Sequence, residues 1–329
     1  MLAMLLLAGE LAARALGPFP ADRTWPDLEA QAKAEHAAAV AASGEREQIV
    51  FAGSSIADAA FDPAVVVAGT PQVTAYSYAQ EGSAAATAAD FLEAVVLPRV
   101  HPDLVVLGLT PNEVNDGGRR QRELEELQRD SRGFRVAAGT PTVADRIDTE
   151  LTSRSALLAH REVLRNPYRI ATKRGTTTTS PWNDPETGAL LRHRDLTYEP
   201  PPPATGDRLA RQDAVWGDFS VGGHQLDAVR RLARRAGEDG AAVVVVELPV
   251  FRPGFLAQIP DGQDLLDRTH RALVALEDEG CVVRLDLRDQ LQDERYWSDP
   301  VHVNGAGTEA ISEAVGAWLA DLAADPATC

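Results

Sequence analysis

The sequence predicts an α/β fold, namely a three-layer α/β/α sandwich around a central parallel sheet. Short apolar runs rich in β-branched residues recur along the 329 residues, and stretches of helix-forming composition separate them. Strands that are apolar throughout are typical of a parallel sheet covered by helices on both faces. The chain is 44% hydrophobic and 25% charged, which is ordinary for a protein that buries a sizeable core.

The strand and helix signals follow one another in a regular order. An Ala-rich helix that stops at Gly44 comes first, and the first apolar run leads into Gly53. The predicted strands cover 48–52, 73–76, 104–107, 242–248 and 282–287. The predicted helices cover 28–43, 83–97, 225–236, 265–279 and 307–322.

Residues 117–222 interrupt this alternation. The part 119–132 is highly charged and helix-prone, and the part 142–164 predicts one or two further helices. We interpret 173–219 as a loop, because runs of four threonines and four prolines within it bury too little apolar surface to pack regularly. We therefore expect 117–222 to be a large insertion in the α/β domain rather than a domain of its own.

The N-terminus has the character of a targeting segment. Residues 1–9 are apolar, but charges follow from Glu10 onward, and a spanning helix needs about 20 apolar residues. Two interpretations remain: an amphipathic helix that packs on the domain, or the end of a membrane anchor that starts upstream. A proline-broken linker follows over 17–29. The predicted organisation is an apolar segment, linker and helix over 1–47, and one α/β domain over 48–329. The predicted location is extracytoplasmic, with anchoring through the N-terminus, and the alternative is cytoplasmic.

The charge of the chain limits its partners. Lys and Arg number 32 against 49 Asp and Glu, which gives a net charge of -17. Such a surface repels polyanions, so the sequence argues against nucleic acid and favours a neutral or cationic partner. The two cysteines, Cys281 and Cys329, lack the spacing of metal ligands and leave the redox compartment open.

The first candidate for chemistry is a serine that follows the first predicted strand. The strand ends at Gly53, which permits a tight turn, and a helix begins directly afterwards. Ser55 then stands at the carboxyl edge of the sheet, where open α/β sheets bind ligands, and it occupies the place of a nucleophile. The alternative is that Ser54 or Ser55 serves only as the N-cap of the helix.

The second candidate is a pair three residues apart, Asp299 and His302, just before a Gly-rich helix start. This spacing allows the carboxylate to contact one imidazole nitrogen and leaves the other free to act as a base. The alternative is that Asp299 caps a turn and His302 is an ordinary loop histidine. The sequence shows no metal-binding motif. No such partner pattern is found at the remaining histidines, which are His36, His101, His160, His193, His224 and His270.

Two further residues are candidate hydrogen-bond donors at the same edge. Asn112 follows the strand predicted over 104–107. Gly82 is predicted at the start of the helix that precedes this strand, where its backbone N–H can approach a ligand closely. An amide side chain and free N–H groups that converge there would form an oxyanion hole for acyl transfer. The alternative is that Gly82 is an ordinary turn glycine and Asn112 an ordinary loop cap.

In this order along the chain, these residues resemble the sequence blocks of the SGNH (GDSL-type) hydrolase family. The family's G-D-S block matches residues 53–55, and its glycine block matches Gly82. Its G-x-N-D block matches 110–113. Its last block, D-x-x-H followed by a polar residue, Gly and a helix, matches 299–305.

The resemblance implies a role for each residue. Ser55 is the nucleophile that attacks an ester carbonyl, His302 is the base, and Asp299 orients the base. The N–H groups of Ser55 and Gly82 and the side chain of Asn112 hold the oxyanion. The resemblance implies no cofactor.

The match extends over 48–116 and 240–320, and it has departures. Ser54 and Glu113 stand where the family has aspartate, and the block around Gly82 lacks the asparagine that commonly precedes it. A G-S-S variant with an apolar N-terminus and a central insertion looks like the bacterial envelope branch of the family. That layout implies a carbohydrate ester, on a cell-envelope polysaccharide, as the substrate, and a small-molecule ester is the alternative.

Other functions are weighed against this one. The α/β-hydrolase fold shares the order Ser, Asp, His, but it expects G-x-S-x-G, and Ala57 stands in place of the second glycine. We reject it. The predicted function is a serine esterase, and the alternatives are an O-acyltransferase with the same triad and a non-catalytic glycan-binding or scaffold protein.

Overall fold

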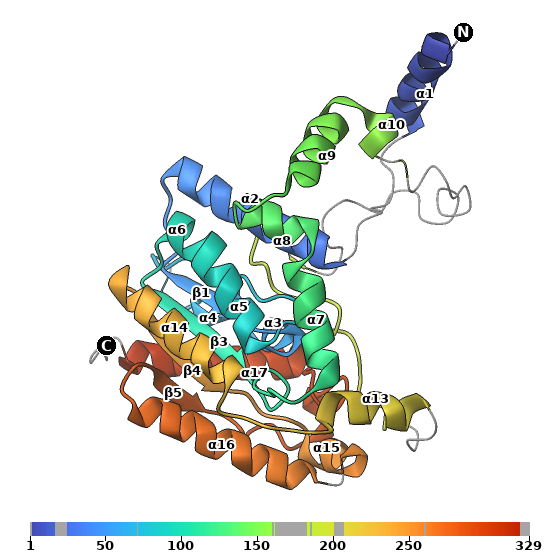
Figure 1. The fold of residues 1–329 in the computed structure, drawn as a ribbon. Helices are drawn as coiled ribbons and strands as arrows, with labels where there is room; N and C mark the ends of the chain where they lie inside the picture. Colours follow the sequence, from blue (N-terminus) through green and yellow to red (C-terminus); the bar gives the residue numbers. More distant parts are fainter. Residues whose placement is uncertain are drawn as a thin grey trace. The chain divides into compact units, whose positions relative to one another are not determined.

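The computed structural model describes residues 2–16, 25–70, 72–159, 161, 183–184, 186–200, 207–259 and 261–322 (Figure 1). Most of the predicted linker, the run of four threonines and most of the run of four prolines lie outside the described residues.

Five parallel strands form one sheet within the described part of the chain. Their order is β2-β1-β3-β4-β5. The strands are β1 (Ile49–Ala52), β2 (Ala75–Ser77), β3 (Leu104–Leu109), β4 (Ala242–Glu247) and β5 (Val283–Asp286). Each overlaps one of the five predicted runs, so the α/β class with a parallel central sheet is confirmed.

Helices separate these strands along the chain. They are α1 (Leu2–Leu16), α2 (Trp25–Ser43), α3 (Ser55–Ala60), α4 (Pro63–Val66), α5 (Ala85–Phe91), the π-helix η1 (Leu92–Val96), α6 (Leu97–Val100), α7 (Arg119–Arg129), α8 (Arg132–Ala137), α9 (Val143–Arg154), α10 (Ala156–Ala159), α13 (Asp207–Trp216), α14 (His224–Glu238), α15 (Arg252–Gln258), α16 (Gly262–Asp278), the 3-10 helix η2 (Glu294–Tyr296) and α17 (Gly305–Leu322). All five predicted helices are present. The helices predicted over 28–43 and 307–322 end where expected, and the helix predicted over 83–97 is made of the consecutive segments α5, η1 and α6.

Two local predictions were wrong. The predicted loop over 173–219 contains α13, because Leu, Arg, Gln and Ala between the proline run and the glycine at 217 are good helix formers. The predicted linker over 17–29 ends inside α2, which begins at Trp25. Pro26 is tolerated there because the first turn of a helix needs no N–H from it.

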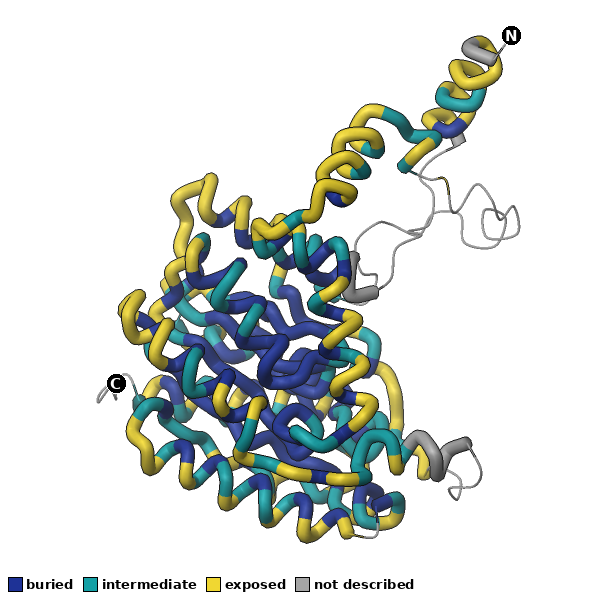
Figure 2. Tube along the Cα trace, in the orientation of Figure 1, coloured by how far each residue is buried: buried dark blue, intermediate teal, exposed yellow. Residues whose placement is uncertain are grey.

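The helix that carries Ser55 is fixed to the sheet by the core. Phe51 of β1 and Phe61 at the end of α3 are fully buried, and their ring centroids lie 5.0 Å apart. Ile311 of α17 belongs to the same apolar cluster. Burying a side chain of this size stabilises the fold by about 1.5–3 kcal/mol. Figure 2 shows continuous burial along the middle strands of the sheet, β1, β3 and β4.

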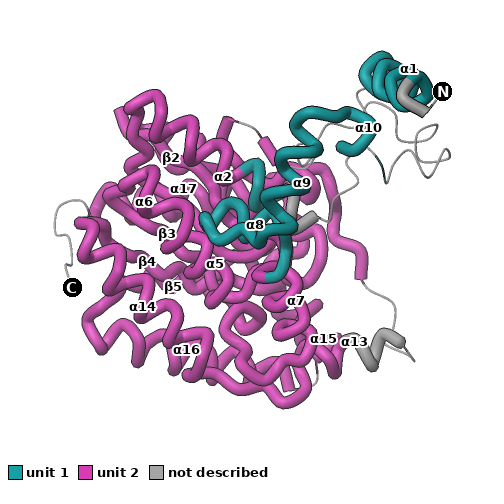
Figure 3. Tube along the Cα trace, turned by 45° about the horizontal axis from the view of Figure 1, so that its top comes forward, with its two compact units in different colours: residues 1–32, 130–181 teal, residues 33–129, 182–329 magenta. Residues whose placement is uncertain are grey.

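The chain divides into two compact units (Figure 3). The first comprises 1–32 and 130–181, and the second, which contains the whole sheet, comprises 33–129 and 182–329. The predicted insertion over 117–222 thus contributes to both units. Within the first unit, the Glu10 carboxylate of α1 accepts hydrogen bonds from the start of α10, and these bonds lower the pKa of Glu10 to about 2. Among the described helices, none combines the length and apolarity that crossing a membrane requires.

The strand order decides where a ligand site lies. From β1 the sheet extends to β2 on one side and to β3 on the other, so the direction of winding reverses between β1 and β3. In parallel sheets of this order, ligands bind outside the carboxyl ends of the strands at that switch point. The turns that follow β1 and β3 carry Ser55 and Asn112, respectively.

Candidate active site

The turn after β1 places Ser55 at the first position of α3. Gly53 has a φ of +139°, and a Cβ on it would lie 2.5 Å from the Cβ of Ala57, so only glycine fits. Ser54 is the N-cap, because its Oγ accepts a hydrogen bond from the Ile56 N–H at 3.0 Å. The capping role therefore falls to Ser54, and the Ser55 hydroxyl is left for another partner.

That partner is His302. The Oγ of Ser55 lies 2.9 Å from Nε2 of His302, and Nδ1 of His302 lies 2.7 Å from Oδ2 of Asp299. The other carboxylate oxygen of Asp299 accepts hydrogen bonds from the N–H groups of Val301 and His302. The structure thus brings together three predicted residues, although 247 positions of sequence separate Ser55 from His302.

The surroundings of Asp299 keep it ionised. Partial burial raises the pKa of its carboxyl group, but the bond to the His302 ring and the two N–H groups outweigh burial and lower the pKa to about 2. An ionised Asp299 accepts a hydrogen bond from Nδ1–H, which fixes the tautomer of His302. The lone pair of Nε2 is then directed to the Ser55 hydroxyl.

Ser54 and Glu113, which depart from the pattern that the sequence resembles, contact each other. The Oγ of Ser54 donates a 2.6 Å hydrogen bond to Oε1 of Glu113, and both residues are buried. The other carboxylate oxygen of Glu113 accepts from the N–H and the hydroxyl of Thr110. A short serine therefore meets a long glutamate where the family has two aspartates. The contact joins the turn after β1 to the turn after β3.

Asn112 belongs to this same network. Its Nδ2 donates to Oε1 of Glu113 at 3.2 Å, and its N–H donates to Oγ1 of Thr110 at 3.3 Å. An amide group carries two N–H donors, so the bond to Glu113 leaves one of them for a ligand. The network places Asn112 one shared carboxylate away from Ser54, the neighbour of Ser55.

Gly82 lies in a turn and not at the helix start that we predicted. The helix α5 begins at Ala85, and Gly82 precedes it with a φ of +76°, a conformation that favours glycine. Two residues earlier, the N–H of Gln80 donates to the carbonyl of Gly53 at 2.9 Å. This bond holds the turn of Gly82 against the turn that carries Ser55.

Behind Ser55, a buried ion pair anchors α3. The carboxylate of Asp58 lies 3.5 Å from Nζ of Lys33, and both side chains are almost fully buried. Ser77 and Asn183 donate further hydrogen bonds to Asp58 at 2.6 and 2.8 Å. Burial raises the pKa of Asp58, while the charge of Lys33 opposes the rise. The sequence gave no signal for this cluster, whose members come from four separate segments.

His193 is the residue at the site that sequence reasoning missed. Its ring stacks on that of His302 with centroids 4.4 Å apart and an angle of 3° between the planes. Nδ1 of His193 lies 2.9 Å from Oγ of Ser298, which in turn donates to the carbonyl of His302. Arg192 lies 3.3 Å from the other ring nitrogen. These contacts assign a neutral ring that donates from Nδ1 and accepts at Nε2.

The pKa of His193 agrees with that assignment. Burial first, and then the neighbouring His302 and Arg192, lower the pKa of His193 to about 4. His193 is therefore uncharged at neutral pH and places no positive charge beside His302. No local pattern could reveal it, because its partner lies more than 100 residues away in sequence.

Two groups of the described residues have metal-ligand atoms close together. One is His193, Asp299 and His302, and its stacked parallel rings direct their lone pairs along parallel planes rather than toward one point. The other is Glu247, His270 and Asp286. There, the Arg284 guanidinium contacts both carboxylates, at 2.9 and 3.3 Å, and supplies the positive charge that a metal would bring.

No protein-family model matches the chain, and no curated protein matches it in sequence.

Proposed function

We propose that this protein hydrolyses a carboxylic ester through Ser55, His302 and Asp299. One observation carries the proposal: the continuous chain of hydrogen bonds from the Ser55 hydroxyl through both nitrogens of His302 to an ionised Asp299. A nucleophile, a base and an orienting carboxylate in this arrangement are the requirements for acyl transfer through a covalent intermediate.

In the acylation step, Oγ of Ser55 attacks the ester carbonyl carbon while its proton passes to Nε2 of His302. Asp299 stabilises the resulting imidazolium, and the neutral His193 stacked on the ring adds no repulsion. The C–O bond of the tetrahedral intermediate then breaks, and the leaving alcohol takes the proton from Nε2. The product is an acyl group on Ser55.

In the second step, water attacks the acyl carbonyl and gives its proton to His302. Collapse of the intermediate returns that proton to Oγ of Ser55 and releases the carboxylic acid. The developing oxyanion requires donors at both stages. We assign these to the N–H of Ser55, which as the first residue of α3 has no acceptor within its helix, to the N–H of Gly82 and to the free N–H of Asn112.

This function agrees with membership of the SGNH (GDSL-type) family, which we propose on the residues and their order. The strand order 2-1-3-4-5 is that of flavodoxin-like three-layer folds. We accordingly propose that the sheet is the centre of an α/β/α sandwich and that 117–222 is an insertion in it. The contact of Ser54 with Glu113 supports the proposal, because it replaces the two aspartates of the family pattern by a complementary pair.

We propose a polysaccharide ester of the bacterial envelope as the substrate and an extracytoplasmic site of action. The charge of -17 excludes nucleic acid as a favourable partner. The leucines of α1 support an association with a membrane surface, since Leu5, Leu7 and Leu11 are each about 60% exposed.

A fluorophosphonate probe tests the proposed function. We expect labelling of the wild-type protein and of Ser43→Ala, a control at an exposed serine, and no labelling of Ser55→Ala. With p-nitrophenyl acetate, Ser55→Ala is expected to lower kcat by about 10⁶-fold. Asn112→Ala should lower kcat by about 10²- to 10³-fold. A folded wild-type protein that takes up no probe would exclude both the esterase and an acyltransferase.

A further inference from the structure

Two adjoining hollows in the second unit lead away from Asp299. The first, of about 340 Å³, is lined by Asp299, Pro300 and Val301 on one side and by Trp216 on the other. The second, of about 560 Å³, continues beyond Trp216. Both share Trp216, Gln258 and Ile259 as lining residues. We call the two hollows together the Trp216 groove, and their volumes lie in the range of ligand sites.

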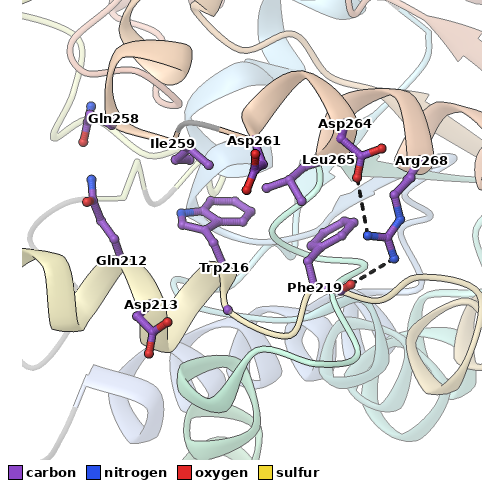
Figure 4. A pocket seen from close by; sticks show the side chains of 11 residues that line it. Gln212, Asp213, Trp216, Phe219, Gln258, Ile259, Asp261, Asp264, Leu265 and Arg268 are labelled. Atoms are coloured by element: carbon purple, nitrogen blue, oxygen red, sulfur yellow. Dashed lines mark hydrogen bonds and ion pairs between the residues drawn. The ribbon is translucent and has the colours of Figure 1, made fainter.

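An aromatic platform forms the middle of the Trp216 groove. Figure 4 shows the indole ring of Trp216 at the centre of the lining, with Gln212 and Gln258 to one side and Phe219 to the other. Its ring meets Phe255 edge to face, with centroids 5.5 Å apart and planes at 84°. Phe255 is fully buried, whereas Trp216 is only partly buried. The Trp216 ring is therefore packed against the core at Phe255 and remains partly exposed to the groove.

Amide and carboxylate side chains line the groove around this platform, and the Gln258 amide already donates to the carbonyl of Gly254 at 3.4 Å. The amides of Gln212 and Gln258 and the carboxylates of Asp213 and Asp261 line the second hollow. Asp261 precedes α16, but its side chain makes no capping hydrogen bond to that helix. Its exposed carboxylate lines the second hollow, where it can accept from a hydroxyl group.

The charge of the groove excludes anions. Among the described residues that line the second hollow, Arg268 is the only cation, and it is already engaged. Its guanidinium donates to the carbonyl of Phe219 at 2.9 Å and pairs with Asp264 at 3.6 Å. Asp213 and Asp261 then leave the lining negative, so uronates, sulfates and phosphates are repelled.

We infer that the Trp216 groove binds a neutral glycan chain, namely the alcohol part of the ester that reacts at Ser55. A sugar ring has an apolar C–H face that stacks on Trp216 and a rim of hydroxyls that bond to amides and carboxylates. A long acyl chain in the same place would bury those carboxylates against methylene groups without hydrogen bonds, which is costly. The inference rests on the proposed esterase function, and it names the substrate class and the subsite.

Binding can be tested without any turnover. Isothermal titration of the full chain with xylohexaose, cellohexaose and chitohexaose is expected to show binding of at least one of them. Trp216→Ala should weaken that binding by about tenfold or more. Asp227→Asn, a control whose side chain is 69% exposed on α14, should not change it. Hexagalacturonate, of equal length and negative charge, should not bind. The assignment is overturned if no neutral hexasaccharide binds, if Trp216→Ala binds equally well, or if hexagalacturonate binds as tightly.

Kinetics separate the glycan from the acyl chain. We compare kcat/KM for acetylated xylo-oligosaccharides with kcat/KM for p-nitrophenyl acetate, and we expect Trp216→Ala to lower this ratio by about tenfold or more. Trp216→Phe, which keeps an aromatic face, should recover part of the ratio. A selective loss on p-nitrophenyl octanoate would instead identify an acyl-chain site and overturn the inference. Glycan binding at Trp216 without hydrolysis of any ester would refute the proposed function and leave the glycan subsite standing.

Discussion

His193 makes a prediction whose size follows from the structure. Its pKa is about 4 in the folded protein, against 6.5 for an ordinary histidine. Between these two values the unfolded chain binds a proton that the folded protein does not bind. The free energy of unfolding therefore rises with pH through this window and is lost as the pH falls through it. Linkage with these two values gives a loss of about 2 kcal/mol between pH 7 and pH 4.5.

The perturbation is His193→Phe, which keeps a ring stacked on His302 and removes the titrating nitrogens. At pH 7 the variant should be less stable by about 1 kcal/mol, because Ser298 loses a hydrogen-bond donor. At pH 4.5 the wild type has lost the linkage contribution and the variant has not. The free energy of unfolding of the variant, relative to that of the wild type, should then be higher by about 2 kcal/mol at pH 4.5 than at pH 7. Titrating carboxylates are common to both proteins and cancel in the comparison.

Urea denaturation at the two pH values measures this difference, with His224→Phe as a control at a half-exposed histidine on α14. Proton–carbon NMR of labelled histidines reports the titration of His193 directly. If the stability gap between wild type and His193→Phe is the same at both pH values, or if the His193 signal titrates near 6.5, the neutral stacked ring is refuted.

Other perturbations probe the support of the site. Gly53→Ala should lower the free energy of unfolding by about 3 kcal/mol, because it forces a Cβ into a backbone with φ of +139°, whereas Gly69→Ala, which meets nothing within 4 Å, should be nearly neutral in the same denaturation assay. Lys33→Met leaves the Asp58 carboxylate buried without its cation and should cost about 3–5 kcal/mol near neutral pH. That cost should shrink as the pH falls and Asp58 takes up a proton. A difference in unfolding free energy between wild type and Lys33→Met that does not change with pH would contradict this prediction. Ser54→Ala removes a helix cap and the buried hydrogen bond to Glu113, so it should lower the melting temperature, at a cost of about 2–4 kcal/mol, while fluorophosphonate labelling of the neighbouring serine persists.

Local sequence determined much of the framework. Runs such as Val243–Val246 are buried strands because they are apolar on both faces. This property can be read from the local sequence alone. Gly53 predicted the tight turn, because glycine readily adopts a positive φ, such as the +139° found there. The pair Asp299 and His302 could be recognised because its members lie three residues apart and meet within one turn.

Longer-range contacts decided the rest. Ser55 and His302 lie 247 residues apart in sequence, and only the folding of the parallel sheet brings them into contact. The order of the sequence blocks suggested this contact but could not show it. Ser54 and Glu113 stand where the pattern of the proposed family has aspartates, and only the structure shows that the two residues bond to each other.

His193 and Trp216 mark the limit of what the sequence by itself determined. Both lie in the stretch whose composition predicted a loop and an insertion, and neither has a neighbour in sequence that announces its role. His193 acquires its low pKa from burial beside His302, and Trp216 is positioned by an edge-to-face contact with Phe255 of another helix. Local propensity depends on each residue and its neighbours in the chain, whereas burial, stacking and charge at a site are properties of segments that meet only in the folded protein.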